Sequence, residues 1–298
     1  MFFFNQLWKK NPPPDEAQER SKAPARSNVK CIHRMSFSGI VVSDVGCVRE
    51  NNEDNYILEA HTNTGSCDHS EASVSVTDWS LRWHFAGVFD GMGGGELGEI
   101  ASEKTAQIFR STFSQVGKGT PKAGIDQLAK EAFLEANNMI VALQKEHNVY
   151  GTTGTVLCTN NEEFKIFHLG DSRAYLFRDG ELYQLTKDQT LAQMKIDAGL
   201  FDENAPNAKA DRHKLTEYIG RDRTQENLHP VGSEWISVQK ADRLLLCSDG
   251  LYDMCSDEEI KRTLKKRGSL EMHARELVET ARRSGGVDNI TCLIVAFS

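Results

Sequence analysis

The order of strand-like and helix-like patterns limits the fold of this chain more than any other feature. Short β-branched and apolar runs predict strands, whereas apolar residues spaced by three and four predict helices. The predicted strands are 39–43, 55–59, 83–89, 155–159, 163–169, 173–178, 181–186, 233–238, 243–248 and 290–297, and the predicted helices are 96–116, 124–146, 257–266 and 270–283. Strands and helices do not alternate one by one, so we expect an α+β domain with antiparallel sheets.

Two internal segments interrupt this order. Residues 61–80 are polar and rich in Ser and Thr, which predicts a hairpin loop, and residues 191–220 read as an insert that mixes helix and loop. Asp179-Gly180 separates two strands and is typical of a hairpin turn. Asp257 precedes an acidic helical start, so we expect it to cap the N-terminus of that helix.

The first 34 residues differ from the rest in composition. They carry seven Lys/Arg against three Asp/Glu, include Pro12-Pro13-Pro14 and show no period. We predict a flexible basic N-terminal tail at 1–34 and one folded domain at 35–298. The apolar cluster from Phe2 to Trp8 has two interpretations. It could contact a membrane surface or a partner protein, or it could belong to a disordered extension without such contacts. It is too short for a signal-peptide core, so no secretion signal is expected.

Charge and cysteine usage exclude several classes of function. The formal net charge is −8, and the part beyond residue 34 carries −12, which argues against nucleic acid as a ligand. No run approaches the roughly 20 apolar residues of a membrane-spanning helix. The seven cysteines form no C-x-x-C pair. An odd count without metal or disulfide spacing predicts a reducing, cytoplasmic location.

Acidic residues recur where predicted strands begin or end. Asp90, Asp171 and Asp249 each follow an apolar run and have a glycine neighbour. Glycine lets a ligand or another backbone approach closely. A single Asp-Gly pair is often only a turn, but several converging carboxylates repel one another and raise one another's pKa. A hard divalent cation such as Mg²⁺ or Mn²⁺ resolves this repulsion, so the joint pattern predicts a metal site.

Six motifs occur in an order that resembles a known family. They are Ser43-Asp44-x-Gly46-x-x-Arg49-x-x-Asn52-Glu53-Asp54, Phe89-Asp90-Gly91-Met92-Gly93-Gly94, Gly151-Thr152-Thr153-Gly154-Thr155, Gly170-Asp171-Ser172-Arg173, Leu246-Cys247-Ser248-Asp249-Gly250-Leu251 and Asp288-Asn289-Ile290-Thr291. From about residue 36 to the last residue, the chain is similar to the type 2C (PPM) metal-dependent protein serine/threonine phosphatases. Any one of these motifs is weak, but the ordered set is specific.

The resemblance implies a fold, an activity and a ligand set. The fold would be a central sandwich of two antiparallel β-sheets flanked by antiparallel helices, with residues 35–298 as the catalytic domain. The activity would be hydrolysis of phosphoserine and phosphothreonine on proteins by water activated at a dinuclear Mn²⁺ or Mg²⁺ centre. The implied metal ligands are Glu53, Asp90, the Gly91 carbonyl, Asp249 and Asp288, with Asp90 bridging the two ions.

Further roles follow from the same resemblance. Arg49 would bind the substrate phosphate, because a guanidinium can contact two phosphate oxygens at once. Asp54 would orient metal-bound water, and Arg49, Asp54 and Asp90 are the expected catalytic residues. Asp171, Asp249 and Asp253 match a weaker third metal site of the family.

Met92 departs from the pattern of many family members. Many eukaryotic members carry histidine where this chain has Met92, whereas many bacterial-type members have methionine there, as this chain does. Methionine cannot donate a proton, so the acid that protonates the leaving alcohol is either water or another residue. His213 lies in the 191–220 insert, which corresponds to a variable flap of the family. We expect a surface histidine there, with a catalytic role as the alternative.

Two other functions remain open at this point. A pseudophosphatase that binds phosphoproteins without turnover would have lost metal ligands, but Glu53, Asp90, Asp249 and Asp288 are all present. A partner-switching regulator acting on a dedicated antagonist would often lack the equivalent of Arg49. The expected partners are phosphorylated proteins, with a cognate Ser/Thr kinase and its substrates as candidates, and the expected state is a monomer.

Overall fold

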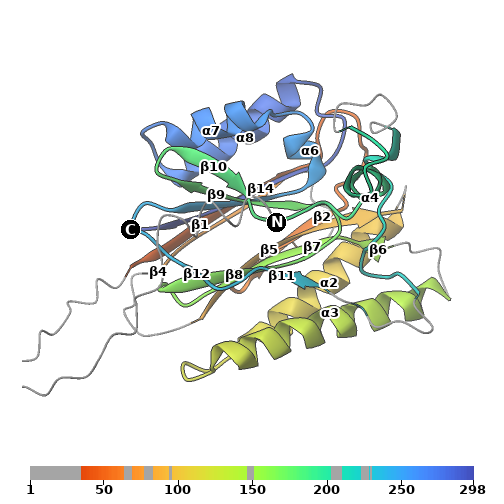
Figure 1. The fold of residues 1–298 in the computed structure, drawn as a ribbon, viewed down its shortest axis with the longest axis horizontal. Coiled ribbons are helices and arrows are strands. Elements are labelled where there is room, and N and C mark those ends of the chain that lie inside the picture. The colour runs from red at the N-terminus through yellow and green to blue at the C-terminus, as the bar shows by residue number, and fades with distance from the viewer. Residues whose placement is uncertain are drawn as a thin grey trace, which may run out of the picture. The chain divides into compact units, whose positions relative to one another are not determined.

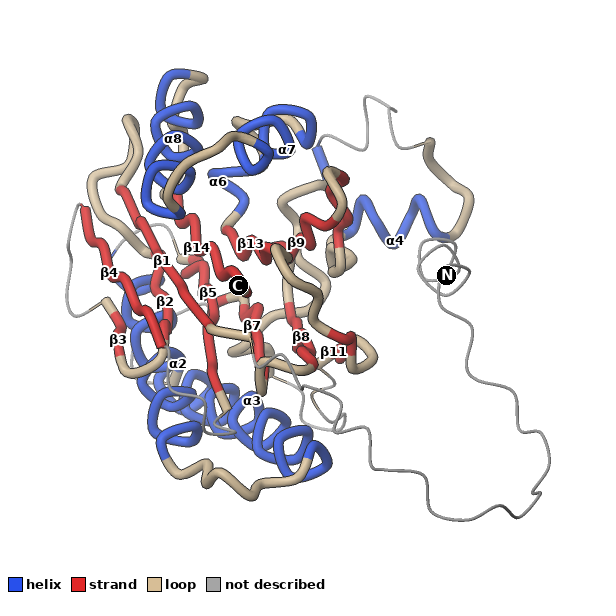
Figure 2. Tube along the Cα trace, turned by 90° about the vertical axis from the view of Figure 1, so that its left-hand side faces the viewer, coloured by secondary structure: helices blue, strands red, loops and turns tan. Residues whose placement is uncertain are grey.

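The computed structural model describes residues 35–63, 69–76, 83–93, 96–145, 151–202, 210–222, 228 and 230–298. The predicted tail at 1–34 lies outside these residues. Within the domain that follows, two β-sheets stack on each other and helices cover both outer faces (Figures 1 and 2). The predicted α+β class and the two antiparallel sheets are therefore confirmed.

The first sheet has six strands in the order β10-β9-β13-β14-β1-β4. Their bounds are Glu181–Gln184 (β10), Arg173–Arg178 (β9), Arg243–Cys247 (β13), Ile290–Phe297 (β14), Phe37–Asp44 (β1) and His69–Val76 (β4). The first and last described strands, β1 and β14, pair along eight residues each, from Phe37 opposite Phe297 to Asp44 opposite Ile290. This pairing brings sequence-distant acidic motifs to the same end of the sheet.

The second sheet has eight strands, six of them in the order β11-β8-β7-β5-β2-β3, with β12 on β8 and β6 on β5. Their bounds are Val231–Gly232 (β11), Glu163–Leu169 (β8), Gly154–Thr159 (β7), His84–Met92 (β5), Asp54–Leu58 (β2), His61–Thr62 (β3), Ile236–Ser237 (β12) and Gly151–Thr152 (β6). Strand β5 sits at the centre and carries Asp90 near its end.

Helices close the two outer faces. Helices α2 (Glu96–Ser114) and α3 (Lys122–Gln144) cover the second sheet, while α7 (Asp257–Lys265) and α8 (Leu270–Arg283) cover the first (Figure 1). The short helices α4 (Leu191–Asp197) and α6 (Asp249–Tyr252) lie near the end that carries the acidic motifs. No helix in the described part of the chain is long and apolar enough to cross a bilayer.

Alternation along the central strands explains why both faces of each sheet are apolar. In β13, Leu244 and Leu246 pack between the two sheets, whereas Leu245 packs beneath α7 and α8. In β14, Leu293 likewise packs between the two sheets, whereas Ile294 packs beneath the helices. Successive side chains of a strand point to opposite faces, so a strand buried on both faces reads as a continuous apolar run. These rigid, fully buried strands position the polar residues at their ends.

Two local predictions are wrong. The segment 61–80 contains strands β3 and β4, and β4 pairs with β1 over its whole length. Its sequence, HSEASVSV, alternates polar and apolar residues as an edge strand does, but its low hydrophobicity resembles a loop. The N-terminal cap of α7 is Ser256, not Asp257. The Ser256 hydroxyl accepts a hydrogen bond from the Glu259 amide, and the Glu259 carboxylate accepts one from the Ser256 amide. The Asp179-Gly180 hairpin turn is confirmed, since both residues have positive φ, 54° and 83°.

Candidate active site

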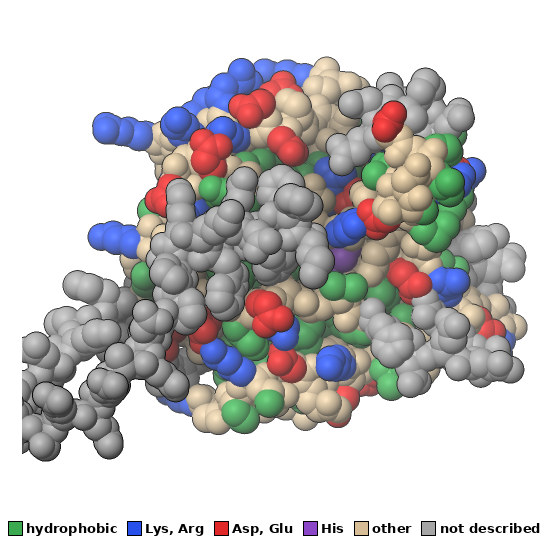
Figure 3. Space-filling view, viewed as in Figure 1, with side chains coloured by type: hydrophobic (Ala, Val, Ile, Leu, Met, Phe, Trp, Pro, Cys, Tyr) green, Lys and Arg blue, Asp and Glu red, His purple; other side chains and the backbone are tan. Residues whose placement is uncertain are grey.

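Net charge alone does not reveal the site. On the face drawn in Figure 3, acidic side chains are scattered among Lys and Arg, and basic side chains gather over α7 and α8. The carboxylates of interest instead lie at the ends of buried strands, where the two sheets meet. Asp54 begins β2 in the second sheet, yet its Oδ2 accepts hydrogen bonds of 2.7 Å each from Ser248, which directly follows β13, and from Thr291 of β14 in the first sheet.

Asp54 is 2% exposed and lies directly opposite Asp90 in the β2–β5 pair. Burial, together with the charges of Asp288 and Asp249, raises the pKa of Asp54 to about 7, even though two hydroxyls donate to it. Its Oδ1 is buried, and no described residue donates a hydrogen bond to it. A buried oxygen without a donor is costly unless a cation or an ordered water satisfies it.

Four other aspartates act on Asp90. Burial raises its pKa well above the ordinary range, and the charges of Asp54, Asp249, Asp171 and Asp288 raise it further. The backbone of Asp90 is fixed by Thr153, whose hydroxyl accepts the Asp90 amide at 3.0 Å and whose amide donates to the Asp90 carbonyl at 2.9 Å. The site is thus a rigid cluster of like charges, in which each carboxylate disfavours ionisation of its neighbours.

The loop between β1 and β2 brings Arg49 to this cluster. Arg49 Nη2 lies 2.7 Å from Asp288 Oδ2, and the arginine side chain is 44% exposed. Burial and the charge of Asp249 raise the pKa of Asp288, while Arg49 opposes that rise. Asn289 holds the loop by donating to the carbonyls of Val45 and Asn51 at 3.0 and 2.9 Å. Sequence reasoning gave Asn289 no role, although it belongs to the Asp288-Asn289 motif.

Glu53 lies where α2 approaches β5. Its amide donates to Asn289 Oδ1 at 2.8 Å, and its carbonyl accepts from Gly91 and Ser102. Gly98, in the first turn of α2, leaves space for the carboxylate, because a Cβ there would lie 2.6 Å from Glu53 Oε2. Glu53 also acts electrostatically on Arg49, which places it at the same cluster.

A second group of charges surrounds α6. Asp249 is the first residue of this helix and Asp253 follows its last residue. His213, from the predicted flap, contacts both: Nδ1 lies 3.4 Å from Asp249 Oδ2 and Nε2 lies 3.6 Å from Asp253 Oδ2. The hydrogen bond that the His213 imidazole donates to the Asp249 carboxylate raises the pKa of His213 to about 9, despite partial burial. The expectation of a surface histidine is confirmed, since the His213 side chain is 59% exposed, but this histidine also contacts two of the expected metal ligands.

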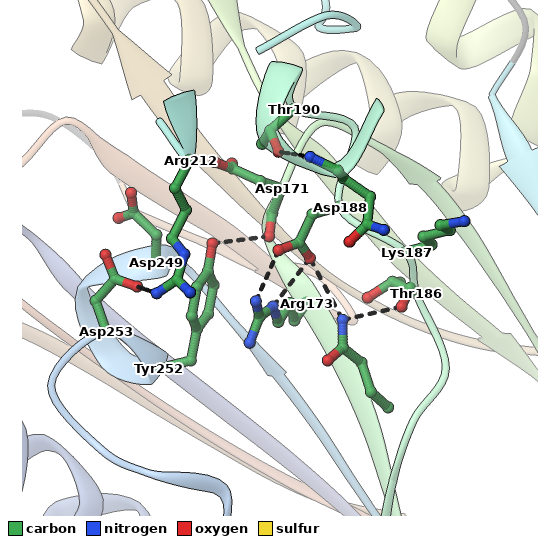
Figure 4. Close-up of polar contacts among 12 residues, drawn as sticks. Asp171, Arg173, Thr186, Lys187, Asp188, Thr190, Arg212, Asp249, Tyr252 and Asp253 are labelled. Atoms are coloured by element: carbon green, nitrogen blue, oxygen red, sulfur yellow. Dashed lines mark hydrogen bonds and ion pairs between the residues drawn. The ribbon is translucent and has the colours of Figure 1, made fainter. Parts of the chain in front are cut away.

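Asp171 is held in place by an aromatic and cationic stack (Figure 4). Its carbonyl accepts the Tyr252 hydroxyl at 3.2 Å, and the Arg173 guanidinium lies 3.7 Å from the Tyr252 ring centroid. Arg173 in turn binds Asp188 in a bidentate pair of 2.9 and 2.7 Å. Arg173 and Asp188 are positioning residues that sequence reasoning missed. The role of Arg173 could have been suspected from the Gly170-Asp171-Ser172-Arg173 motif, because this arginine lies two residues after the expected metal ligand Asp171.

All the predicted site residues therefore converge on one end of the sandwich. Asp54, Asp90, Asp171, Asp249 and Asp288 form one electrostatically coupled group. Arg49 and Glu53 border this group, and Gly91 pairs with Thr152 beside it. Asp253 lies next to Asp249. An α-β-β-α sandwich with clustered carboxylates and an arginine at one end is the architecture of the type 2C phosphatases.

Comparison with known proteins agrees with this architecture. Residues 42–195 match the family described as Protein phosphatase 2C. The chain is 34% identical over 260 residues to the serine/threonine protein phosphatase PstP of Mycobacterium tuberculosis, covering 85% of this chain and 43% of that protein. It is 31% identical over 212 residues to the serine/threonine phosphatase stp of Listeria welshimeri, covering 70% of this chain and 82% of that protein. The chain belongs to the protein phosphatase 2C family.

One solved structure is informative for the site. It is the catalytic domain of PstP in complex with two manganese ions, with a TM-score of 0.66 and 29% identity, covering 88% of this chain and 99% of that chain. The present chain spans 43% of the length of the Mycobacterium tuberculosis PstP sequence that it matches.

Proposed function

We propose that this chain hydrolyses phosphoserine and phosphothreonine on proteins, with two Mn²⁺ or Mg²⁺ ions bound at the carboxylate cluster. The observation that carries the proposal is the convergence of Asp54, Asp90, Asp171, Asp249 and Asp288, with Arg49 at their border. The bacterial relatives, which are named as serine/threonine phosphatases, support the same reaction class.

The residues present fit divalent cations. Burial and mutual repulsion raise the pKa of Asp90, Asp171 and Asp288, and Asp54 keeps a buried oxygen without a described donor. Oxygen ligands of this kind suit Mg²⁺ and Mn²⁺. The proposed ligands are Glu53, Asp90 as a bridge, the Gly91 carbonyl, Asp249 and Asp288, with Asp171, Asp249 and Asp253 for a third ion.

When bound, such ions acidify a coordinated water molecule and neutralise charge on a phosphoryl group. The chain's own residues orient the reactants. Asp54 is held through Oδ2 by two hydroxyls, so its Oδ1 is free to accept a hydrogen bond from the attacking water. Arg49 forms an ion pair with Asp288 in this structure. Once Asp288 binds a cation, the exposed guanidinium of Arg49 can form an ion pair with the substrate phosphate instead. Met92 has no acidic proton to donate, so the leaving alkoxide would take its proton from water.

Substrates and setting follow from this proposal. The partners would be phosphorylated proteins, including a cognate Ser/Thr kinase and its substrates, and the enzyme would act in signal transduction. The described cysteines are all free, which supports a reducing, cytoplasmic location. The monomeric state stays a prediction. A pseudophosphatase is less favoured, because the proposed ligands are not only present but converge.

The proposal is tested by phosphate release from a phosphothreonine peptide, with added Mn²⁺ and with chelator. We expect turnover that requires the metal, disappears with EDTA and resists inhibitors of the okadaic-acid type. Full activity in a rigorously chelated sample would exclude the metal mechanism. Absence of turnover, with Mn²⁺ and phosphopeptide both bound, would favour the pseudophosphatase.

A further inference from the structure

His213 is held at the carboxylates around α6 by backbone and side-chain contacts in the flap. Asp211, two residues earlier, accepts from Lys195 of α4 at 2.5 Å and from Lys214 at 2.8 Å. The Lys214 carbonyl accepts the Leu191 amide at 2.8 Å, at the start of α4. The turn that carries His213 is therefore tied to a helix rather than free.

The flap is also tied at its base to the strand ends that carry the site. The Gln189 amide donates to the Gly170 carbonyl at 2.8 Å, and Gly170 donates back to Gln189 Oε1 at 2.7 Å. Thr216 donates to the Gln189 carbonyl at 2.8 Å. Gly170 precedes Asp171, so the segment that presents His213 and the strand that presents Asp171 share one hydrogen-bond network. His213 consequently faces the carboxylates in a set position.

The donor atoms at this point form a compact mixed set. One ligand atom each from His213, Asp249 and Asp253 can be chosen so that all three lie within 4.8 Å of one another. Asp253 Oδ1 is buried, and no described residue gives it a hydrogen bond. Asp171 is 5% exposed, and the charge of Asp249 acts on it directly. Two carboxylates thus contact one imidazole from a different segment, and the charge of that imidazole also acts on Asp171.

We propose that His213, Asp249 and Asp253 together bind a divalent transition metal, so that the flap supplies a nitrogen ligand to the site. The inference rests on the proposed function and deepens it, because Asp249 and Asp253 are already among the residues proposed for a third ion and His213 is added to them as a nitrogen ligand. Imidazole suits Zn²⁺ and other transition metals, and Mn²⁺ binds such nitrogen and oxygen sites more weakly than those ions, whereas Mg²⁺ prefers oxygen ligands alone. This site therefore selects a transition metal, and metal occupancy fastens the flap to the body of the domain.

Nitrogen coordination distinguishes this site from the proposed dinuclear centre, whose ligands are all oxygen. The probe is Mn²⁺ alone, added to the full chain, with the coupling between Mn²⁺ and nitrogen-14 read by pulsed EPR. The variants are His213→Gln, which keeps the volume but removes the imidazole, and the neighbouring Arg212→Gln. Arg212 Nη1 lies 4.0 Å from Asp253 Oδ1, so it is a second cation at the same carboxylates with no ability to bind a metal.

We expect nitrogen coupling in the unmodified chain and in Arg212→Gln, and its loss in His213→Gln. Calorimetry should show the weakest Mn²⁺ site at least about tenfold weaker in His213→Gln, no weaker in Arg212→Gln, and Mg²⁺ affinity nearly unchanged in both. Mn²⁺ binding without nitrogen coupling, or coupling that survives in His213→Gln, would overturn the inference while leaving the dinuclear centre intact. Tighter Mn²⁺ binding in both variants would overturn it too, because His213, like Arg212, would then act only as a positive charge that competes with the metal for the carboxylates. Failure of the unmodified chain to bind Mn²⁺ at all would count against the proposed function itself.

Discussion

Asp54 and Asp90 occupy directly opposite positions on the adjacent antiparallel strands β2 and β5. Residues paired in this way project from the same face of the sheet, and like charges there destabilise the pair. Asp54 is additionally fixed by hydroxyls from the other sheet. The metal-free domain therefore contains a charge conflict that a bound cation relieves, and this relationship yields the first two predictions.

Replacing Asp90 with Asn should stabilise the metal-free protein. Asn keeps the shape of Asp but cannot ionise, and like charges directly opposite one another on adjacent strands are destabilising. Thermal melts in chelator at pH 8 should therefore show a higher Tm for Asp90→Asn, whereas stabilisation by added Mn²⁺ should be lost. Asp179→Asn, in the β9–β10 turn, is the matched control and should leave both properties unchanged. A lower Tm for Asp90→Asn in chelator would disprove the charge conflict.

The stability of the metal-free protein should depend on pH through Asp54. Its pKa is about 7 when folded and about 4 in an unfolded chain, so the folded state binds more protons between these values. This group therefore contributes a free energy of unfolding that falls as pH rises from about 4 to 7. Mn²⁺ should restore more stability at high pH than at low pH. Comparing Tm against pH for the unmodified chain and Asp54→Asn isolates the effect, and identical slopes would contradict it.

Arg49→Ala should impair phosphate binding and turnover together. The guanidinium would contact phosphate oxygens that stay negative throughout the reaction. Losing a charge-assisted contact costs about 1.5–3 kcal/mol, or roughly 10- to 150-fold in kcat/KM. Mn²⁺ affinity should not fall, because Arg49 competes with the metal for Asp288. Arg110→Ala, on α2, serves as the control. Unaltered kcat/KM combined with weaker Mn²⁺ binding would show that Arg49 acts on the metal instead.

Met92 allows a test of leaving-group protonation. Met92→Ala should have a small effect on both an aryl phosphate ester and a phosphothreonine peptide, because methionine provides packing and no proton. Met92→His should raise kcat/KM selectively for the phosphothreonine peptide, since an alkoxide is the poorer leaving group. If His213 supplied the proton, His213→Ala would depress turnover of the alkyl ester far more than that of the aryl ester. Equal losses on the two esters would exclude His213 as the acid.

The buried elements could be predicted from sequence because their patterns are strong. Strand 163–169 and helix 270–283 agree with β8 and α8 at both ends. Strand β4 was missed because an edge strand needs little hydrophobicity, and its identity depends on pairing with β1. The short helix α6 was missed for a related reason. One turn of helix carries no periodicity, and α6 forms where Asp249 leaves the end of β13.

The site could be predicted as a set of residues but not as a network. Carboxylates at strand ends and six ordered motifs indicated which side chains would meet. The contacts of His213 with Asp249 and Asp253 depend on how the flap folds back, which no local pattern encodes. The support of Asp171 by Tyr252 and Arg173 likewise joins segments about 80 residues apart. Tertiary packing determines such contacts.

If the clustered carboxylates make this chain a metal-dependent protein phosphatase, kcat of Asp90→Asn is the quantity that should change most. The measurement is phosphate release from a phosphothreonine peptide at saturating Mn²⁺, with Asp179→Asn as a fold-neutral control. We predict that Asp90→Asn folds, melts cooperatively and loses several orders of magnitude in kcat, because Asp90 would bridge both cations. Activity within tenfold of the unmodified chain, at the same Mn²⁺ concentration, would contradict the account.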